Sequence, residues 1–239
     1  MLLEWAGLRI VTDPTFDAPQ SYEDPGSTPL VKTAGPAFSR EDLGQVDLVL
    51  LSHHAHKDNL DYEGLELLAT GVKTLSTRKA SMDLFGGSVV GLDSWESYTV
   101  GDATVTAVPA LHGPPGSERF VGPVIGFVLE AVGAPTIYVS GDNASVPLVE
   151  QIADRFSPVD VAILFAGAAR VPAIDAALTL TGTDAVAAAK ALQAAKVAIV
   201  HAEDWKHLSE DRATVNQAFA DADLTSLLVQ MPRGERVEL

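Results

Sequence analysis

The sequence predicts a layered α+β or α/β protein in which sheets lie inside and helices lie outside. Short apolar, β-branched runs follow one another in the first half of the chain, whereas in the second half they alternate with helical patterns. Hydrophobic residues make up 47% of the 239 residues, which is enough for a substantial core. Because no linker-like change of composition divides the chain, we expect one domain over residues 1–239.

In the first half, Gly, Pro and Asp turns separate the expected elements. Residues 2–12 are a strand, or a hairpin that turns at Ala6 and Gly7. The stretch 15–40 is rich in Pro, Ser, Gly and Asp and has no sustained period, so we expect a functional loop or a lid there. A short helix over 60–69 points Leu65 and Leu68 inward. A strand is expected over 46–52, and further short strands, spaced like an antiparallel layer, are expected over 74–76, 89–92, 97–100 and 104–110.

In the second half, strands and helices alternate. Val149, Ile152 and Phe156 recur on one face of an expected helix over 147–156. Two more helices begin at the capping residues Thr183 and Ser209 and end near residues 195 and 221. The apolar run 159–165 has the composition of a strand buried on both sides. The other expected strands cover 124–130, 136–140, 197–200, 227–230 and 236–239.

Composition and charge narrow the classes of function. The formal net charge is −16 and the Lys and Arg residues are scattered, so we expect no nucleic-acid partner. The chain has no basic leader and no run of about eighteen apolar residues, which favours a soluble cytoplasmic protein without a membrane partner. Cysteine is absent, so any metal must be held by His, Asp, Glu or Asn. A small-molecule substrate is expected, and a homo-oligomer is left open.

All six histidines lie in three clusters that follow apolar strand-like runs. The clusters are LLSHHAHKDNLD, VPALHGPPG and IVHAEDWKHLSE, and a fourth run, TIYVSGDN, ends in Asp142. Loops at strand ends are common places for functional sites. In the first cluster His54, His56 and Asp58 are spaced two apart, so one loop can aim all three at a small volume. These residue types suit zinc, manganese or iron, and the pattern favours a metal site.

The segment SHHAHKDN resembles a variant, HAHKDN, of the HxHxDH motif of the metallo-β-lactamase-fold hydrolases. The later His112, Asp142 and His201 appear in that family's order, and the resemblance runs from the TDP segment at 12–14 to His201. It is strongest for the branch of ascorbate-phosphate lactonase-like proteins. The resemblance implies a four-layer αββα sandwich. Because Met1 begins almost inside the family's opening segment, the first strand is expected to be missing or incomplete.

The resemblance also implies a metal centre with one or two divalent ions, zinc or manganese first and iron as an alternative. It assigns His54, His56 and His112 to the first metal, Asp58 and His201 to the second, and Asp142 to a bridge between them. Two departures leave questions open. The extra His53 could replace His54 as a ligand. Asn59 stands where the motif has histidine, and an amide is a poorer ligand, so the second metal is expected to be weak or absent.

The implied activity is metal-dependent hydrolysis of a small ester, lactone or phosphate-containing molecule by metal-bound hydroxide. Asp58 would orient the hydroxide or take its proton. His207 is either a substrate-side donor or proton shuttle, or a partly exposed helix-entry residue. Trp205 either walls the pocket or packs. Two alternatives remain: an iron-dependent oxidoreductase of the same fold, and a non-catalytic scaffold whose site was partly lost at Asn59.

Overall fold

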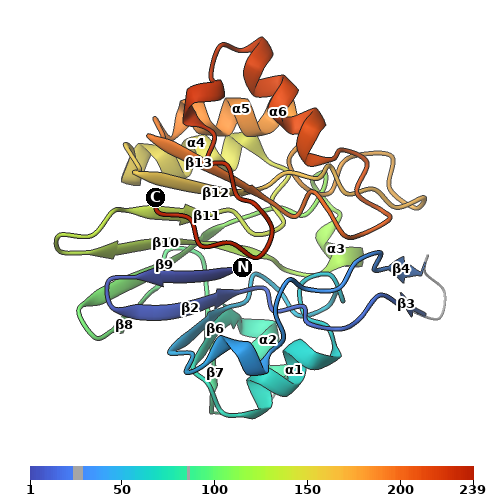
Figure 1. The fold of residues 1–239 in the computed structure, drawn as a ribbon, viewed down its shortest axis with the longest axis vertical. Helices are drawn as coiled ribbons and strands as arrows, with labels where there is room; N and C mark the ends of the chain where they lie inside the picture. Colours follow the sequence, from blue (N-terminus) through green and yellow to red (C-terminus); the bar gives the residue numbers. More distant parts are fainter. Residues whose placement is uncertain (24–28, 85–86) are drawn as a thin grey trace.

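The computed structural model describes residues 1–23, 29–84 and 87–239, and it shows two sheets packed face to face between layers of helices (Figure 1). One sheet has the order β1-β2-β5-β6-β7. Its strands are β1 (Leu2–Trp5), β2 (Leu8–Thr12), β5 (Leu48–Leu50), β6 (Thr74–Thr77) and β7 (Val89–Leu92). The other has the order β13-β12-β11-β10-β9-β8. Its strands are β8 (Ser97–Val100), β9 (Ala103–Pro109), β10 (Ile125–Ala131), β11 (Ile137–Val139), β12 (Val161–Phe165) and β13 (Lys196–Val200).

The helices cover the outer faces of the two sheets (Figure 1). Helices α1 (Tyr62–Ala69) and α2 (Arg78–Asp83) lie on the five-stranded sheet, and α4 (Val146–Phe156), α5 (Gly182–Ala191) and α6 (Arg212–Asp221) lie on the six-stranded sheet. The short helix α3 (Glu118–Val121) and the pair β3 (Ser21–Tyr22) and β4 (Leu30–Val31) lie near one end of the sheets. Two short 3-10 helices cover Glu41–Leu43 and Thr225–Leu227.

Apolar side chains fill the spaces between these layers. Ile10, Leu50 and Leu75 of the first sheet pack against Phe127 and Ile163 of the second, and all five are buried. A separate buried cluster joins the six-stranded sheet to its helices, and a third lies beneath α1. The predicted α+β fold with four αββα layers is therefore confirmed.

The hairpin at Ala6 and Gly7 and most of the predicted strands are present, but the strands predicted as one antiparallel layer are divided between the two sheets, with β7 in one and β8 in the other. The strands predicted at 74–76 and 89–92 pair in parallel as β6 and β7, rather than antiparallel. A parallel pair needs a longer crossover, and the unpredicted helix α2 lies in it. In α1, Leu67 and Leu68 are buried, whereas Leu65 is only partly buried.

Three local predictions in the second half were wrong. Thr181 caps α5 in place of Thr183, because its side chain and that of Asp184 form a reciprocal capping box. Asp211 caps α6, whereas Ser209 donates a hydrogen bond to the carbonyl oxygen of Ala168. The two predicted C-terminal strands do not form, and that end of the chain contributes a single bridge, between Leu228 and Val197.

The stretch predicted as a loop or a lid contains the short β3–β4 pair and approaches the loop after β13 through a bridge between Lys32 and Trp205. Residues 24–28 of that stretch lie outside the described residues, so the lid stays a prediction. Within residues 1–23, 29–84 and 87–239, no helix has the length and apolar character needed to cross a bilayer.

Candidate metal centre

Three histidines from two loops meet at one end of the sheets. His53 and His56 follow β5, and His112 follows β9. Each offers a ring nitrogen, and these three atoms lie within 4.8 Å of one another. The closest pair is His53 Nε2 and His56 Nδ1, at 2.9 Å. Three imidazoles this close could supply the donor set of a first metal site.

A second group lies beside the first and consists of Asp58, Asp142 and His201. His201 Nε2 lies 3.2 Å from Asp58 Oδ2 and 3.7 Å from Asp142 Oδ1. The other oxygen of Asp142, Oδ2, lies 3.8 Å from His112 Nε2 in the first group. Asp142 therefore stands between the two groups, one oxygen toward each.

Most polar atoms of the second group are buried and lack hydrogen bonds. Among the described residues, both carboxylate oxygens of Asp142, Asp58 Oδ1 and both ring nitrogens of His201 have no hydrogen-bond partner. Burying such groups without partners costs several kcal/mol, by a rough estimate. Because a divalent cation satisfies carboxylates and imidazoles together, these residues fit a metal ion.

Charge and burial set the protonation states in the two groups. Burial lowers the pKa of His53 well below its usual value, and burial also lowers that of His56, which favours the neutral imidazoles that bind metals. Burial also lowers the pKa of His201, but the nearby carboxylates of Asp142 and Asp58 have the larger combined effect and raise this pKa to about 9. Although burial would raise the pKa of Asp58, the close approach of the His201 and His207 rings to its carboxylate holds that pKa well below its usual range.

Polar contacts behind the first group orient its rings. The carbonyl oxygen of Leu178 lies 2.7 Å from His112 Nδ1 and can only accept, so Nδ1 carries the proton and Nε2 is free for a metal. Asp13 Oδ1 accepts a 2.8 Å hydrogen bond from the Ser52 backbone, and Ser52 Oγ lies 3.1 Å from His53 Nδ1. Burial and the charge of Asp142 raise the pKa of Asp13 to about 8. Sequence reasoning noted Asp13 only as part of the TDP segment and missed this positioning role.

Gly141 holds the loop that carries Asp142 against the loop that carries His53. Its φ is +55°, and an added Cβ would lie 2.6 Å from Ser52 Cβ and 2.8 Å from the Ile125 carbonyl oxygen. We expect Gly141→Ala to lower the free energy of unfolding by about 3 kcal/mol, because backbone strain adds to overpacking. Gly133→Ala is the matched control, since Gly133 has φ +76° but open space around it, and it should cost about 1 kcal/mol. Urea denaturation measures both, and equal losses would mean that the close approach is unimportant.

The structure does not bring His54 to the first group. Its Nε2 lies 2.9 Å from Asp83 Oδ2 of α2, and His53 takes the place that we predicted for His54. The prediction assumed an extended loop, in which residues two apart point the same way. The chain instead bends over residues 54–56 before a turn closed by a 3.0 Å hydrogen bond from the Leu60 backbone to the His56 carbonyl, and these bends bring the rings of His53 and His56 together.

The remaining predicted residues surround the second group. His207 Nε2 lies 3.0 Å from Asp58 Oδ2. Asn59 is fully buried, and neither polar atom of its side chain has a hydrogen-bond partner among the described residues. Trp205 is buried and its ring lies 6.3 Å from that of His207. The predicted residues therefore gather in one place, His54 excepted.

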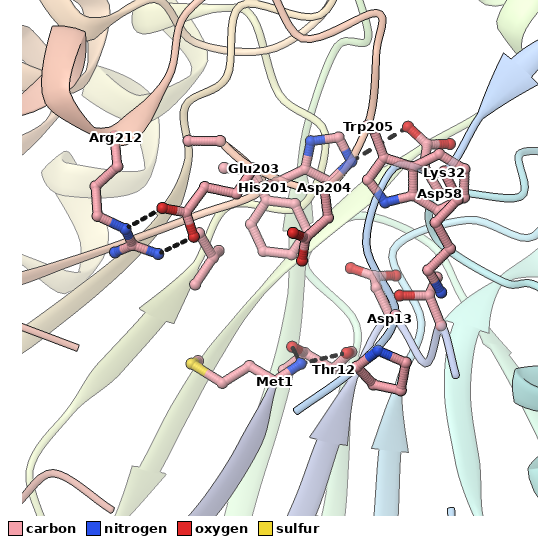
Figure 2. Close-up of a pocket in the computed structure, with 16 residues that line it drawn as sticks. Met1, Thr12, Asp13, Lys32, Asp58, His201, Glu203, Asp204, Trp205 and Arg212 are labelled. Carbon is pink, nitrogen blue, oxygen red and sulfur yellow. Dashed lines mark hydrogen bonds and ion pairs between the residues drawn. The ribbon is translucent and has the colours of Figure 1, made fainter. Parts of the chain in front are cut away.

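A cavity of about 230 Å³ opens beside the second group (Figure 2). Asp58, Trp205 and Lys32 lie on one side of it, and Glu203 and Arg212 lie on the other. Lys32 is buried, and its Nζ lies 2.9 Å from Asp61 Oδ2 and 5.5 Å from the Trp205 ring centre. Sequence reasoning missed Lys32, because it lies in a stretch with no periodic pattern.

Comparison with known proteins identifies the family. The family described as the beta-lactamase superfamily domain matches residues 8–202. The chain belongs to the beta-lactamase superfamily. Among its relatives is a UPF0173 metal-dependent hydrolase of Pyrococcus abyssi, which is 26% identical over 203 residues, covering 83% of this chain and 84% of the relative. The predicted class, a metal-dependent hydrolase of this superfamily, agrees with that relative's name.

Two solved structures of hydrolases share the fold. A possible metal-dependent hydrolase from Veillonella parvula has a TM-score of 0.86 at 19% identity, over 100% of this chain and 95% of that one. An isothiocyanate hydrolase from Delia radicum gut bacteria has a TM-score of 0.84 at 22% identity, with the same coverage. Identities this low establish the fold alone, and the ascorbate-phosphate lactonase-like branch stays a prediction.

Proposed function

We propose that this member of the superfamily hydrolyses a small ester, lactone or phosphate-containing molecule with one or two divalent metal ions, zinc or manganese. The observation that carries the proposal is the pair of three-residue donor groups that meet at Asp142, the second of which lines the cavity. His53, His56 and His112 would hold one ion, and Asp58, Asp142 and His201 the other.

When bound, the metal supplies a water of lowered pKa and polarises the oxygen of the substrate that is attacked. The protein supplies the rest of the chemistry. Asp58 is ionised, and its unpartnered Oδ1 can orient the attacking water and accept its proton. Burial of the two groups keeps bulk water away and strengthens charge interactions within the site.

The cavity sets the scale of the substrate. A volume of about 230 Å³ is below the roughly 300–1,000 Å³ of sites for drug-sized ligands, which favours a small molecule. Trp205 offers an apolar wall. A net charge of −16 argues against a nucleic-acid or anionic membrane partner. A cytoplasmic location belongs to the same proposal, and a homo-oligomer stays open.

Metal analysis combined with a substrate panel tests this function. The protein is purified, loaded with zinc or manganese, and assayed with aryl esters, lactones, phosphomonoesters and phosphodiesters. An isothiocyanate is added to the panel because one protein of similar fold is an isothiocyanate hydrolase. We expect stoichiometric metal and hydrolysis of at least one class. Stoichiometric iron with oxygen consumption and no hydrolysis would favour the oxidoreductase alternative. Failure to retain any metal after soaking would favour the scaffold.

Variants of His53 and His54 test which of these two histidines binds the first metal ion. We expect His53→Ala to lose the first ion, because one of three imidazole donors is removed, whereas His54→Ala should keep it, because that ring contacts Asp83. Metal content by plasma mass spectrometry after gel filtration measures both variants. The opposite result, with metal lost only from His54→Ala, would show that His54 is the ligand, as the HAHKDN motif predicts.

A further inference from the structure

We propose that His207 is the fourth ligand of the second metal and supplies the imidazole that position 59 lacks. This inference rests on the metal centre proposed above and goes beyond it, because it moves His207 from the substrate side to the metal. The second group has three donors without it, namely Asp58, Asp142 and His201. Asn59 is a weak donor at best.

Distances within the second group match a shared ion. Zinc bonds of 2.0–2.1 Å in a tetrahedron place two donor atoms about 3.3 Å apart. Asp58 Oδ2 lies 3.0 Å from His207 Nε2 and 3.2 Å from His201 Nε2, and Asp142 Oδ1 lies 3.7 Å from His201 Nε2. The imidazoles of His201 and His207 thus both lie at ligand-to-ligand separations from Asp58 Oδ2, and Asp142 Oδ1 lies slightly further away, measured from His201 Nε2.

The surroundings of His207 disfavour its predicted role as a proton shuttle. A shuttle passes a proton from one ring nitrogen to a neighbour of the other. His207 Nδ1 is buried, and within the described part of the chain it has no hydrogen-bond partner to receive a proton. The side chain is only 12% exposed, so solvent has little access to it. A ligand needs only Nε2, which faces Asp58.

The backbone holds His207 in place. His201 and Asp204 have φ of +53° and +73°, and the chain bends over residues 201–204 directly after β13. The His207 carbonyl accepts a 3.0 Å hydrogen bond from the Arg170 backbone, and the Lys206 backbone donates a 3.0 Å bond to the Val31 carbonyl. Such anchoring on both sides gives the preorganised ring that a ligand requires.

Metal binding by His207→Ala and Asn59→Ala tests the proposal. Apo proteins are titrated with Zn²⁺ by calorimetry, and the Co²⁺ forms are compared by absorption spectroscopy, which reports the donor set independently of activity. We expect two ions in the unmodified protein. His207→Ala should bind the second ion about 100-fold more weakly or worse, because loss of a direct ligand should cost at least as much as loss of a supporting contact. Asn59→Ala should keep both ions. Circular dichroism of the apo proteins checks folding, and His207→Gln is the fallback if His207→Ala does not fold.

Each outcome decides a distinct question. Two ions of unchanged affinity in His207→Ala, or in His207→Gln if that variant is used, would overturn the inference and leave the hydrolase proposal standing. Loss of the second ion from Asn59→Ala would also overturn it, because the amide would then hold the ion. A single ion in the unmodified protein would remove the second site and leave a mononuclear enzyme. No ion in the unmodified protein would defeat the proposed function itself.

Discussion

Replacing Asp142 with Asn is expected to remove at least one metal ion and to lower kcat/KM roughly a thousandfold. Asp142 is fully buried, and its two oxygens face His112 and His201, one in each donor group. Loss of its charge removes the negative group shared by both sites. Metal-ion stabilisation of a transition state is worth several kcal/mol, and about 4 kcal/mol corresponds to a factor of a thousand.

Thermal denaturation separates this effect from misfolding. Metal stabilises a folded protein by mass action, so adding Zn²⁺ should raise the Tm of the unmodified protein and leave that of Asp142→Asn almost unchanged. The apo form of the variant should be at least as stable as unmodified apo protein, because an unpartnered buried charge has been removed.

Asp83→Asn is the matched control for Asp142→Asn. Asp83 also contacts a histidine, His54, at 2.9 Å, but outside both donor groups. It should keep the metal-induced rise in Tm and the full kcat/KM. An Asp142→Asn variant that kept two ions would show that this carboxylate does not bridge the groups.

The sequence predicted where the site lies because the relevant signals are local. An apolar run followed by a polar residue marks a strand end, and the four runs that end before His53, His112, Asp142 and His201 do meet at one end of the sheets. Burial of β12 on both faces was likewise visible in its continuous apolar run.

Features that depend on distant contacts could not be predicted. The exchange of His54 for His53 depends on the bends of the loop after β5, which the spacing of residues does not reveal. The approach of His207 to Asp58 depends on backbone hydrogen bonds to Val31 and Arg170, far away in the chain. The expected C-terminal strands do not form because they lack a neighbouring strand. Their residue pattern suits a strand, but among the described residues they pair with another strand only through the bridge at Leu228.

Lys32→Met is expected to lower the free energy of unfolding by about 3–5 kcal/mol, because it leaves the buried Asp61 carboxylate without its cation. The side chains of Lys32 and Asp61 are 2% and 0% exposed, and their charged atoms lie 2.9 Å apart. Asp61 also caps α1 by accepting a hydrogen bond from the Gly64 backbone and accepts another from the Asp17 backbone. An unpaired charge at this position therefore disturbs both the helix and the wall of the cavity.

Guanidinium denaturation and calorimetry measure the effect, and Tm should fall by roughly 6–20 °C for a chain of this size. Arg9→Met is the matched control, because Arg9 pairs with Glu4 at 3.0 Å but both side chains are more than a third exposed. Pairs of that kind contribute about 0–1 kcal/mol, so its Tm should change little.

A double-mutant cycle assigns the loss to the charge pair. In an Asp61→Asn background no carboxylate is left unpaired, so adding Lys32→Met should cost clearly less than it does in the unmodified protein. An equal cost in both backgrounds would contradict the ion-pair explanation and would point instead to lost packing of the lysine against Trp205. Since Lys32 and Trp205 also form a backbone bridge, the same cycle measured on Zn²⁺ affinity shows whether the pair holds the loop that carries His207.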